Sequence, residues 1–238
     1  MKLTEHLLKI SGVEYETNSN CYALVYDSGL ALIDCGYEET QWRRMEGALK
    51  RWGHSLSEVT HVFLTHAHFD HGGNAKRVNE LGAKLLTSPG DVYKIEQANP
   101  ESERLFGTPL IPGKVDQTLK DGDRFAFPGG GTVTAIETPG HSAGSMSFLV
   151  EADGIKALAT GDMFWPVACP PEDRDDAQLG FMGSDDFSLD ALIASLEKLS
   201  KLPADILLSG HYHVYFGDVP RLVGLALRKA IKIKEEAA

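Results

Sequence analysis

The sequence predicts an α/β protein in which two β-sheets pack face to face and helices cover both outer faces, a four-layered αββα sandwich. Strand-like segments precede helical ones in each half of the chain, at 5–36 and again at 124–160. The chain has 238 residues of ordinary globular composition, 42% of them hydrophobic, which is enough to bury such a core. Because no linker, tandem repeat or low-complexity segment interrupts the pattern, we predict one domain over 1–238.

The first half begins with three short strands within 5–36. Two apolar runs, at 21–26 and 30–33, flank Asp27-Ser28-Gly29, which is typical of a hairpin turn. A helix is expected from Glu38 to Trp52, where apolar side chains recur at helical spacing before Gly53. The elements expected next are a strand at 59–65, a helix at 73–81, a strand at 84–87 and a helix at 91–97.

The second half contains two segments without a readable pattern. Residues 98–123 are rich in Pro, Gly and polar side chains, and we expect an excursion over the surface. We expect 164–187 to be irregular, with the acidic run Glu172-Asp173-Arg174-Asp175-Asp176 as a solvated face. Ser188 is placed to cap a helix that reaches Leu202. The other elements expected are strands at 124–127, 132–138, 145–150, 155–160 and 206–208, and an amphipathic helix from 218 onward.

Charge and cysteine content narrow the partners and the location. A net charge of −11 without clustered Lys and Arg argues against nucleic acid as a partner. Cys21, Cys35 and Cys169 form no CxxC pair, which favours reduced thiols over a disulfide framework. The first residues are too polar for a signal peptide, and no apolar stretch is long enough to cross a membrane. We therefore expect a cytoplasmic protein that acts on a small molecule without a membrane partner, its oligomeric state being left open.

Potential metal ligands are concentrated in HAHFDH at 66–71, directly after the apolar run Val62-Phe63-Leu64. If the strand continued through this segment, alternation would place His66, His68 and Asp70 on one side of the backbone. His71 would follow where two glycines let the chain turn into the next helix. Three imidazoles and a carboxylate in so short a stretch suit a borderline divalent metal, zinc before iron or manganese.

Three further potential ligands share one local pattern, an apolar strand that ends in a small residue followed by a ligand. They are His141 in TPGH, Asp162 in TGD and His211 in SGH. A glycine before each of them allows unusual backbone angles and close approach, as metal-binding loops require. Together with His66, His68, Asp70 and His71 they make seven potential ligands, which is enough for two metal ions and too many for one.

The set HAHFDH at 66–71, TPGH at 138–141, TGD at 160–162 and SGH at 209–211 resembles the metallo-β-lactamase superfamily, and more narrowly its glyoxalase II-type hydrolases. The resemblance covers about 15–215 and implies the αββα metallo-β-lactamase fold, with metals at one edge of the paired sheets. It implies that His66, His68 and His141 hold one metal. Asp70, His71 and His211 would hold the second, and Asp162 would bridge the two.

The implied chemistry is attack of a metal-bridging hydroxide on a carbonyl, because zinc lowers the pKa of bound water from about 15.7 to near 7. Asp70 is the candidate catalytic residue, since it could both ligate and orient the nucleophile. Asp34, at another strand end, could accept a hydrogen bond from a ligand histidine or simply cap its own turn. His6, His54 and His61 are interpreted as surface residues, and His213 is left open.

Differences between this chain and individual subfamilies of the superfamily narrow the range of activities that we expect. Asp162 as bridging ligand argues against antibiotic hydrolysis, His68 against the diiron oxygen-reducing relatives, and the acidic charge against RNA processing. Some homoserine-lactone hydrolases have Tyr where this chain has Trp165. Classical glyoxalase II carries an additional helical domain that helps to hold glutathione, whereas the printed chain extends only to Ala238. The sequence thus predicts a dinuclear metallohydrolase acting on a small ester, thioester or lactone.

Three alternatives stay open. One is a persulfide dioxygenase, which resembles glyoxalase II yet uses a single iron. The others are a phosphodiesterase and a metal-binding scaffold without activity. Aromatic residues next to the ligands, Phe69, Phe164, Trp165, Tyr212 and Tyr215, either wall a pocket or belong to the core. Substrate specificity is expected to reside in 98–123 and 164–187, so the substrate itself is not predicted.

Overall fold

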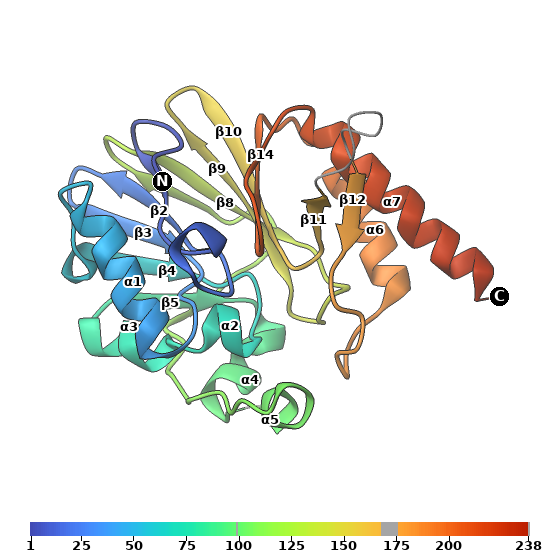
Figure 1. Ribbon diagram of the computed structural model, residues 1–238, viewed down its shortest axis with the longest axis horizontal. Coiled ribbons are helices and arrows are strands. Elements are labelled where there is room, and N and C mark those ends of the chain that lie inside the picture. The colour runs from blue at the N-terminus through green and yellow to red at the C-terminus, as the bar shows by residue number, and fades with distance from the viewer. Residues whose placement is uncertain (99, 168–175, 238) are drawn as a thin grey trace.

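The computed structural model describes residues 1–98, 100–167 and 176–237, and it contains two six-stranded sheets that pack against each other (Figure 1). In the first sheet β2 runs antiparallel to β1 and β3, whereas β3, β4, β5 and β6 are parallel neighbours. Its strands, in spatial order, are β1 (Leu7–Lys9), β2 (Tyr22–Tyr26), β3 (Gly29–Ile33), β4 (Val59–Phe63), β5 (Lys84–Thr87) and β6 (Gln117–Thr118).

The second sheet is built from the second half of the chain. β8, β9 and β10 form an antiparallel meander, and β13 pairs parallel to β10. Therefore β8, β10 and β13 point the same way, and their carboxyl ends meet at one edge. The strands, in spatial order, are β14 (Tyr215–Phe216), β13 (Ile206–Ser209), β10 (Ile155–Gly161), β9 (Met146–Ala152), β8 (Gly131–Glu137) and β7 (Arg124–Phe127).

Helices cover the outer face of each sheet (Figure 1). Met45 of α1 (Glu38–Lys50) and Val78 of α3 (Ala75–Leu81) are fully buried against the first sheet. Leu196 of α6 (Leu189–Leu199) and Val223 of α7 (Val219–Glu236) are fully buried against the second. Each such side chain stabilises its layer by about 1.5–3 kcal/mol. The remaining helices are α2 (Phe69–Gly72), α4 (Val92–Glu96), α5 (Pro100–Phe106) and three short 3₁₀ turns at Val13–Tyr15, Leu56–Glu58 and Pro89–Asp91.

The central layer of the core lies between the two sheets. Phe63 of the first sheet and Phe148 of the second are fully buried there, with their ring centroids 5.5 Å apart. Two sheets with helices on both outer faces confirm the predicted αββα architecture. Among the described residues, no helix has the length and apolar character needed to cross a bilayer.

One helix cap was expected from the sequence, and the structure shows a second that was not. Ser188 caps α6 through a hydrogen bond from the Ala191 N–H to its hydroxyl, as predicted. Asp218 likewise caps α7 by accepting from the Arg221 N–H. Side-chain oxygens at these positions satisfy backbone donors that the first helical turn leaves without a partner.

Two expectations about irregular segments are wrong. Residues 98–123 are not merely a surface excursion, because they form α5 and β6 and bury Leu110 and Leu119. Residues 164–187 contain β11 (Phe164–Val167) and β12 (Asp176–Leu179), which pair antiparallel. These short elements lack a readable period, since tertiary packing rather than local propensity stabilises them. Cys169 and the acidic run, except Asp176, lie outside the described residues.

Candidate metal centre

The HAHFDH segment leaves the sheet earlier than alternation required. β4 ends at Phe63, so His66 and His68 lie in a loop, and Asp70 and His71 lie in α2. The expected single-sided strand is therefore wrong, and a short helical turn brings the ligands together instead. Gly73 is required there, because a Cβ on it would lie 2.2 Å from the Phe69 carbonyl oxygen.

The first ligand group consists of three buried histidines. Nδ1 of His68 lies 3.0 Å from Nε2 of His66 and 3.0 Å from Nε2 of His141. His66 and His68 follow β4, whereas His141 follows β8 in the other sheet. The two sheets therefore both contribute to this group, as the resemblance implied.

The second group lies beside the first and combines two carboxylates with two histidines. Nε2 of His211 lies 3.2 Å from Oδ2 of Asp70 and 3.1 Å from Oδ2 of Asp162. Nε2 of His71 lies 3.1 Å from Oδ1 of Asp162. Within each group, the potential ligand atoms all lie within 4.8 Å of one another. The structure thus brings all seven predicted residues together in two sets, with Asp162 in the second.

In three of these histidines the outer ring nitrogen, which faces away from the ligand group, has a hydrogen-bond partner. That hydrogen bond determines how the ring faces the centre. Nδ1 of His141 faces the Phe181 carbonyl at 2.9 Å, and Nδ1 of His211 faces the Asn18 carbonyl at 3.2 Å. Nδ1 of His71 faces Oδ2 of Asp34 at 2.8 Å. Because carbonyl and carboxylate oxygens only accept, we infer that each Nδ1 carries the proton. Each Nε2 then faces the centre and offers it a lone pair when the ring is neutral.

Asp34 connects the two ligand groups through hydrogen bonds, directly to His71 and through Thr65 to His66. It is buried and holds a left-handed backbone conformation with φ of 61°. Besides His71, it accepts hydrogen bonds from the backbone N–H and the hydroxyl of Thr65, at 2.7 and 2.9 Å. Since the Thr65 hydroxyl donates to Asp34, its oxygen is left to accept from Nδ1 of His66 at 3.0 Å. Asp34 therefore orients a ligand histidine, which was one of the two interpretations of its position.

The two groups differ in their electrostatics. Burial lowers the pKa of His66 and His141, and lowers that of His68 to about 3, so the first group is neutral. Burial also opposes protonation of His71 and His211 in the second group. The negative charge of Asp162 and the neighbouring carboxylates outweighs this effect of burial. The carboxylates raise the pKa of His71 well above its usual value and that of His211 to about 10.

The donor set fits divalent metal ions. Nε2 of His71 and Oδ1 of Asp162 are buried without a hydrogen-bond partner, although they face each other. Inner nitrogens whose protons a bound cation would displace, and carboxylates beside them, are the arrangement that a metal cation satisfies. Imidazole and carboxylate are ligands that zinc accepts in proteins, as do iron and manganese.

The glycines that precede the three separated ligands confirm the expected close approach. Gly140 and Gly161 have φ of 148° and 50°, conformations that favour glycine. Gly210 has no such angle, but a Cβ on it would lie 2.2 Å from Oδ1 of Asp162. Its role is therefore to let the β13 loop approach the carboxylate.

A partly buried ion-pair network ties the loops of the first group together. Oδ2 of Asp91 accepts the N–H of Ala67 at 2.8 Å, and Oδ2 of Asp186 accepts the N–H of Ala143 at 3.0 Å. Nζ of Lys94 joins them, 3.5 Å from Asp91 and 2.5 Å from Asp186. Sequence reasoning missed this network. Asp91 follows β5 and a glycine, the same pattern that marked the ligands, so a signal was available.

A cavity of about 250 Å³ opens beside the ligands. Of the aromatic residues expected near it, Phe69, Trp165 and Tyr212 line it, whereas Phe164 and Tyr215 pack in the core under α6 and α7. Phe106, Phe181 and Asn18 also line the cavity and were missed. They lie in segments without periodicity, so the sequence carries no signal for them.

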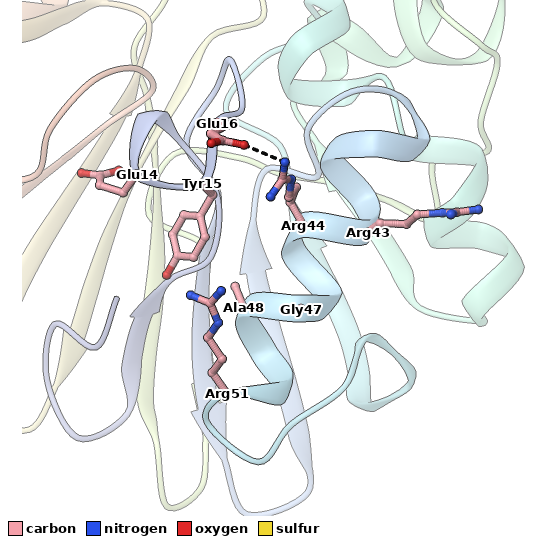
Figure 2. Close-up of a pocket in the computed structure, with 8 residues that line it drawn as sticks. All are labelled: Glu14, Tyr15, Glu16, Arg43, Arg44, Gly47, Ala48 and Arg51. Atoms are coloured by element: carbon pink, nitrogen blue, oxygen red, sulfur yellow. Dashed lines mark hydrogen bonds and ion pairs between the residues drawn. The ribbon is translucent and has the colours of Figure 1, made fainter.

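His213 and Cys35 belong to neither ligand group. His213 is exposed and faces Glu14 at 3.4 Å, and Cys35 is buried with its thiol against the His71 carbonyl. Figure 2 shows a separate cavity of about 360 Å³ beside α1, where Arg44 pairs with Glu16. It is lined by Glu14, Tyr15, Glu16, Arg43, Arg44, Gly47, Ala48 and Arg51, none of which belongs to either ligand group.

Fold and site together define a protein with an αββα sandwich and a cluster of metal-binding residues at the edge where the two sheets meet. The chain belongs to the metallo-β-lactamase superfamily, whose family model matches residues 15–211. This confirms the resemblance seen in the sequence.

Individual relatives agree with this assignment. The chain is 35% identical over 153 residues to a hydroxyacylglutathione hydrolase of Brucella anthropi, covering 64% of this chain and 50% of the relative. It is 32% identical over 154 residues to the uncharacterized protein YobT of Bacillus subtilis, covering 61% of each. The chain thus spans about half the length of the hydroxyacylglutathione hydrolases it matches. These relatives support the glyoxalase II-like branch.

Solved structures show the same fold. A Cronobacter sakazakii metallo-β-lactamase with a HARLDQ motif superimposes with a TM-score of 0.79 at 20% identity, covering 100% of this chain and 97% of that one. The FEZ-1 metallo-β-lactamase of Legionella gormanii gives a TM-score of 0.75 at 20% identity, with coverage of 100% and 94%. At this identity the likeness concerns the fold alone.

Proposed function

We propose that the protein is a dinuclear metal-dependent hydrolase that cleaves a small ester, thioester or lactone. The observation that carries the proposal is the pair of adjacent ligand groups, each drawn from both sheets. Their inner histidine nitrogens are oriented by hydrogen bonds on the outer ones. A site of this kind is suited to two metal ions that share one water.

We assign His66, His68 and His141 to the first metal, and Asp70, His71 and His211 to the second. Asp162 is proposed to bridge the two metals. Its Oδ1 and Oδ2 face His71 and His211, and its charge also acts on all three histidines of the first group. Zinc is the proposed metal, with iron or manganese as the alternatives.

When bound, the two ions would supply a Lewis acid for the carbonyl oxygen and a water acidified enough to attack at neutral pH. The chain's own residues position the reactants. Asp70 lines the cavity and accepts a hydrogen bond from the Asn18 amide at 3.2 Å, which fixes its carboxylate at the cavity floor. It is therefore placed to orient the attacking water, the catalytic role proposed for it.

No Ser, Thr or Cys is among the described residues that line the cavity. Ser184 is buried with its hydroxyl 3.1 Å from Nε2 of His68. We propose that it orients His68 and is not a nucleophile. The Ser184→Ala variant, once loaded with metal, should accordingly keep turnover without forming a covalent acyl-enzyme, as intact mass spectrometry would show.

The persulfide dioxygenase is the main competing function. It needs a redox metal with open positions, whereas a hydrolase needs only a Lewis acid and a hydroxide. The second group, with Asp70, His71 and His211, is complete here, and a mononuclear iron enzyme does not require it. The relatives named as hydroxyacylglutathione hydrolases also favour thioester cleavage.

The deciding experiment is turnover by iron-free, zinc-reconstituted protein under anaerobic conditions. Hydrolysis of acyl thioesters, esters or lactones in that state would establish the hydrolase. Absence of turnover there, together with oxygen uptake on a persulfide only in the iron-loaded form, would overturn it in favour of the dioxygenase. A phosphodiesterase would instead cleave bis(4-nitrophenyl) phosphate faster than any acyl substrate.

A further inference from the structure

We propose that the substrate carries a small, uncharged, apolar acyl group, which aromatic side chains hold beside the metal ligands. This inference rests on the proposed function and defines its substrate class. It depends on three features of the cavity: its aromatic lining, the absence of Lys and Arg from its described lining, and its size.

One aromatic wall adjoins the three-histidine group. The ring of Phe106 lies 5.7 Å from that of His68, 5.3 Å from that of Phe69 and 5.4 Å from that of Phe181. Tyr37 supports Phe69 from the other side at 5.1 Å. Three contiguous rings beside His68 form an apolar surface next to the first ligand group.

This wall is fixed in place by the centre itself. The Phe181 carbonyl accepts a hydrogen bond from Nδ1 of His141. Phe106 is the last residue of α5, and Glu101 of the same helix accepts a hydrogen bond from the N–H of Asp185 at 2.6 Å. Phe181 is nevertheless 43% exposed. The loop that carries Phe181 keeps this apolar ring exposed to solvent. The ring is therefore buried only when a bound molecule covers it.

A second aromatic wall adjoins the carboxylate group. Trp165 lies 5.6 Å from the ring of His211 and 5.5 Å from that of Tyr212. Tyr212 is 48% exposed and has a positive φ of 59°. Its carbonyl accepts a hydrogen bond from the buried Lys9 at 2.7 Å, which holds this strained turn in place. The reacting bond would therefore lie between two apolar surfaces.

Apart from the metal centre itself, the described lining of the cavity offers no cationic side chain to an anionic acyl group. Among the described lining residues, no Lys or Arg occurs, and the charged ones are Asp70, Asp162 and histidines of the ligand groups. The neighbouring cations are engaged elsewhere: Lys94 pairs with Asp186, and Arg104 with Asp185. A carboxylate at the end of the acyl chain, away from the metal ions and against the aromatic rings, would lose hydration without gaining a cationic side chain, which is costly in an apolar site.

Size restricts the acyl group further. At about 250 Å³ the cavity is smaller than the roughly 300–1,000 Å³ typical of sites for drug-sized ligands. A short aliphatic or a single-ring acyl group matches this space. A tripeptide thiol with two carboxylates matches neither the volume nor the charge of the described lining.

The test compares thioesters of one neutral thiol, N-acetylcysteamine, that differ only in the acyl group. Hexanoyl and glutaryl groups have similar length but differ in charge, and the acetyl group lacks the chain. With zinc-loaded protein, kcat/KM should be at least about tenfold higher for hexanoyl than for glutaryl, the discrimination expected when an apolar pocket selects a substrate. A ratio of one or below would overturn the inference.

Paired variants locate the effect. Phe181→Ala should lower kcat/KM about tenfold more for hexanoyl than for acetyl. Met182→Ala is the matched control, since Met182 is the next residue and equally exposed at 43% but does not line the cavity. Equal losses in both variants, or a loss for acetyl alone, would contradict the apolar wall. Phe181→Arg should raise glutaryl turnover relative to hexanoyl.

A binding measurement separates this inference from the proposed function. The thioether analogue of the hexanoyl substrate cannot be hydrolysed, and calorimetry should show that it binds more tightly than the glutaryl thioether. If all three thioesters are inert but the apolar thioether binds selectively, the proposed hydrolysis fails and the apolar pocket stands. If acetyl is hydrolysed but neither longer analogue shows selectivity, the hydrolase stands and the pocket inference fails.

Discussion

The His71 ring donates from Nδ1 to Oδ2 of Asp34 at 2.8 Å, and the same carboxylate accepts both hydrogen bonds of Thr65. One buried side chain thus orients a ligand of the second group directly, and a ligand of the first group through the Thr65 hydroxyl. Outer hydrogen bonds of this kind fix the tautomer and ring orientation of metal-binding histidines.

Asp34→Asn should therefore weaken metal binding without removing a ligand. An amide presents either its oxygen or its NH₂ group to the three donors, so at least one hydrogen bond weakens and the negative charge is lost. We expect affinity for the second zinc ion to fall by about 10–100-fold, measured by competition with a chromophoric chelator. Asp190→Asn, on the exposed face of α6, is the control and should leave both affinities unchanged. Unaltered zinc affinity in the Asp34 variant would show that the carboxylate only supports the loop.

Asp162→Ala should lower occupancy of both metal positions, because the proposed bridging carboxylate serves both. Elemental analysis of protein purified without chelator should give about two equivalents for the native chain and fewer than one for the variant. His211→Ala, which removes a ligand of the second metal alone, should retain the first equivalent. If the Asp162 variant also retains one tightly held ion, Asp162 serves only the second group, to which its contacts assign it.

Lys94→Met should destabilise the fold and loosen the first group. It leaves the fully buried Asp91 and the partly buried Asp186 without the cation that joins them, and leaving a buried carboxylate unpaired costs about 3 kcal/mol. Urea unfolding of metal-free protein gives this loss. Lys114→Met removes an exposed pair with Asp116 and should cost no more than about 1 kcal/mol. Equal costs in the two variants would mean that the network contributes no more than a surface pair.

The stability of the metal-free protein should depend on Asp91 between about pH 4 and pH 6. Burial raises the pKa of its carboxyl to about 6 from 3.8, although Lys94 opposes the shift. Because the folded-state pKa is the higher one, the stabilising contribution is complete below pH 3.8 and is lost as pH rises through 6. The loss amounts to about 3 kcal/mol.

Asp91→Asn lacks this titration and can still accept the Ala67 N–H through its amide oxygen. The free energy of unfolding of the variant, minus that of the native chain, should therefore rise between pH 4 and pH 6 and level off above. Urea titrations at half-unit intervals would measure it. A difference that stays constant over this range would show that Asp91 has an ordinary pKa.

The architecture and the ligand positions could be predicted because both leave local signals. Hydrophobic periodicity marks α1 and α6, and a glycine before a ligand at a strand end marks His141, Asp162 and His211. Such patterns survive in the sequence because burial and backbone geometry restrict which residues are allowed.

Some of the residues that line the cavity could not be predicted, because they leave no local signal in the sequence. Phe106 and Phe181 lie in segments whose structure depends on contacts distant in the sequence, such as the hydrogen bond from the Asp185 N–H to Glu101. The predicted path of the HAHFDH segment was also wrong, because β4 ends at Phe63 and a helical turn replaces the expected strand alternation. Period alone does not determine where a strand ends.

Each ligand group draws on both halves of the chain: His66, His68, Asp70 and His71 precede residue 100, and His141, Asp162 and His211 follow it. A metal ion bound by both halves acts as a cross-link between the two sheets, comparable to a disulfide that closes a long loop. Metal ions would then contribute to the cohesion of the sandwich as well as to its chemistry. A chelator would weaken the seam between the sheets, so metal availability in the cell would govern how long the folded chain survives proteolysis.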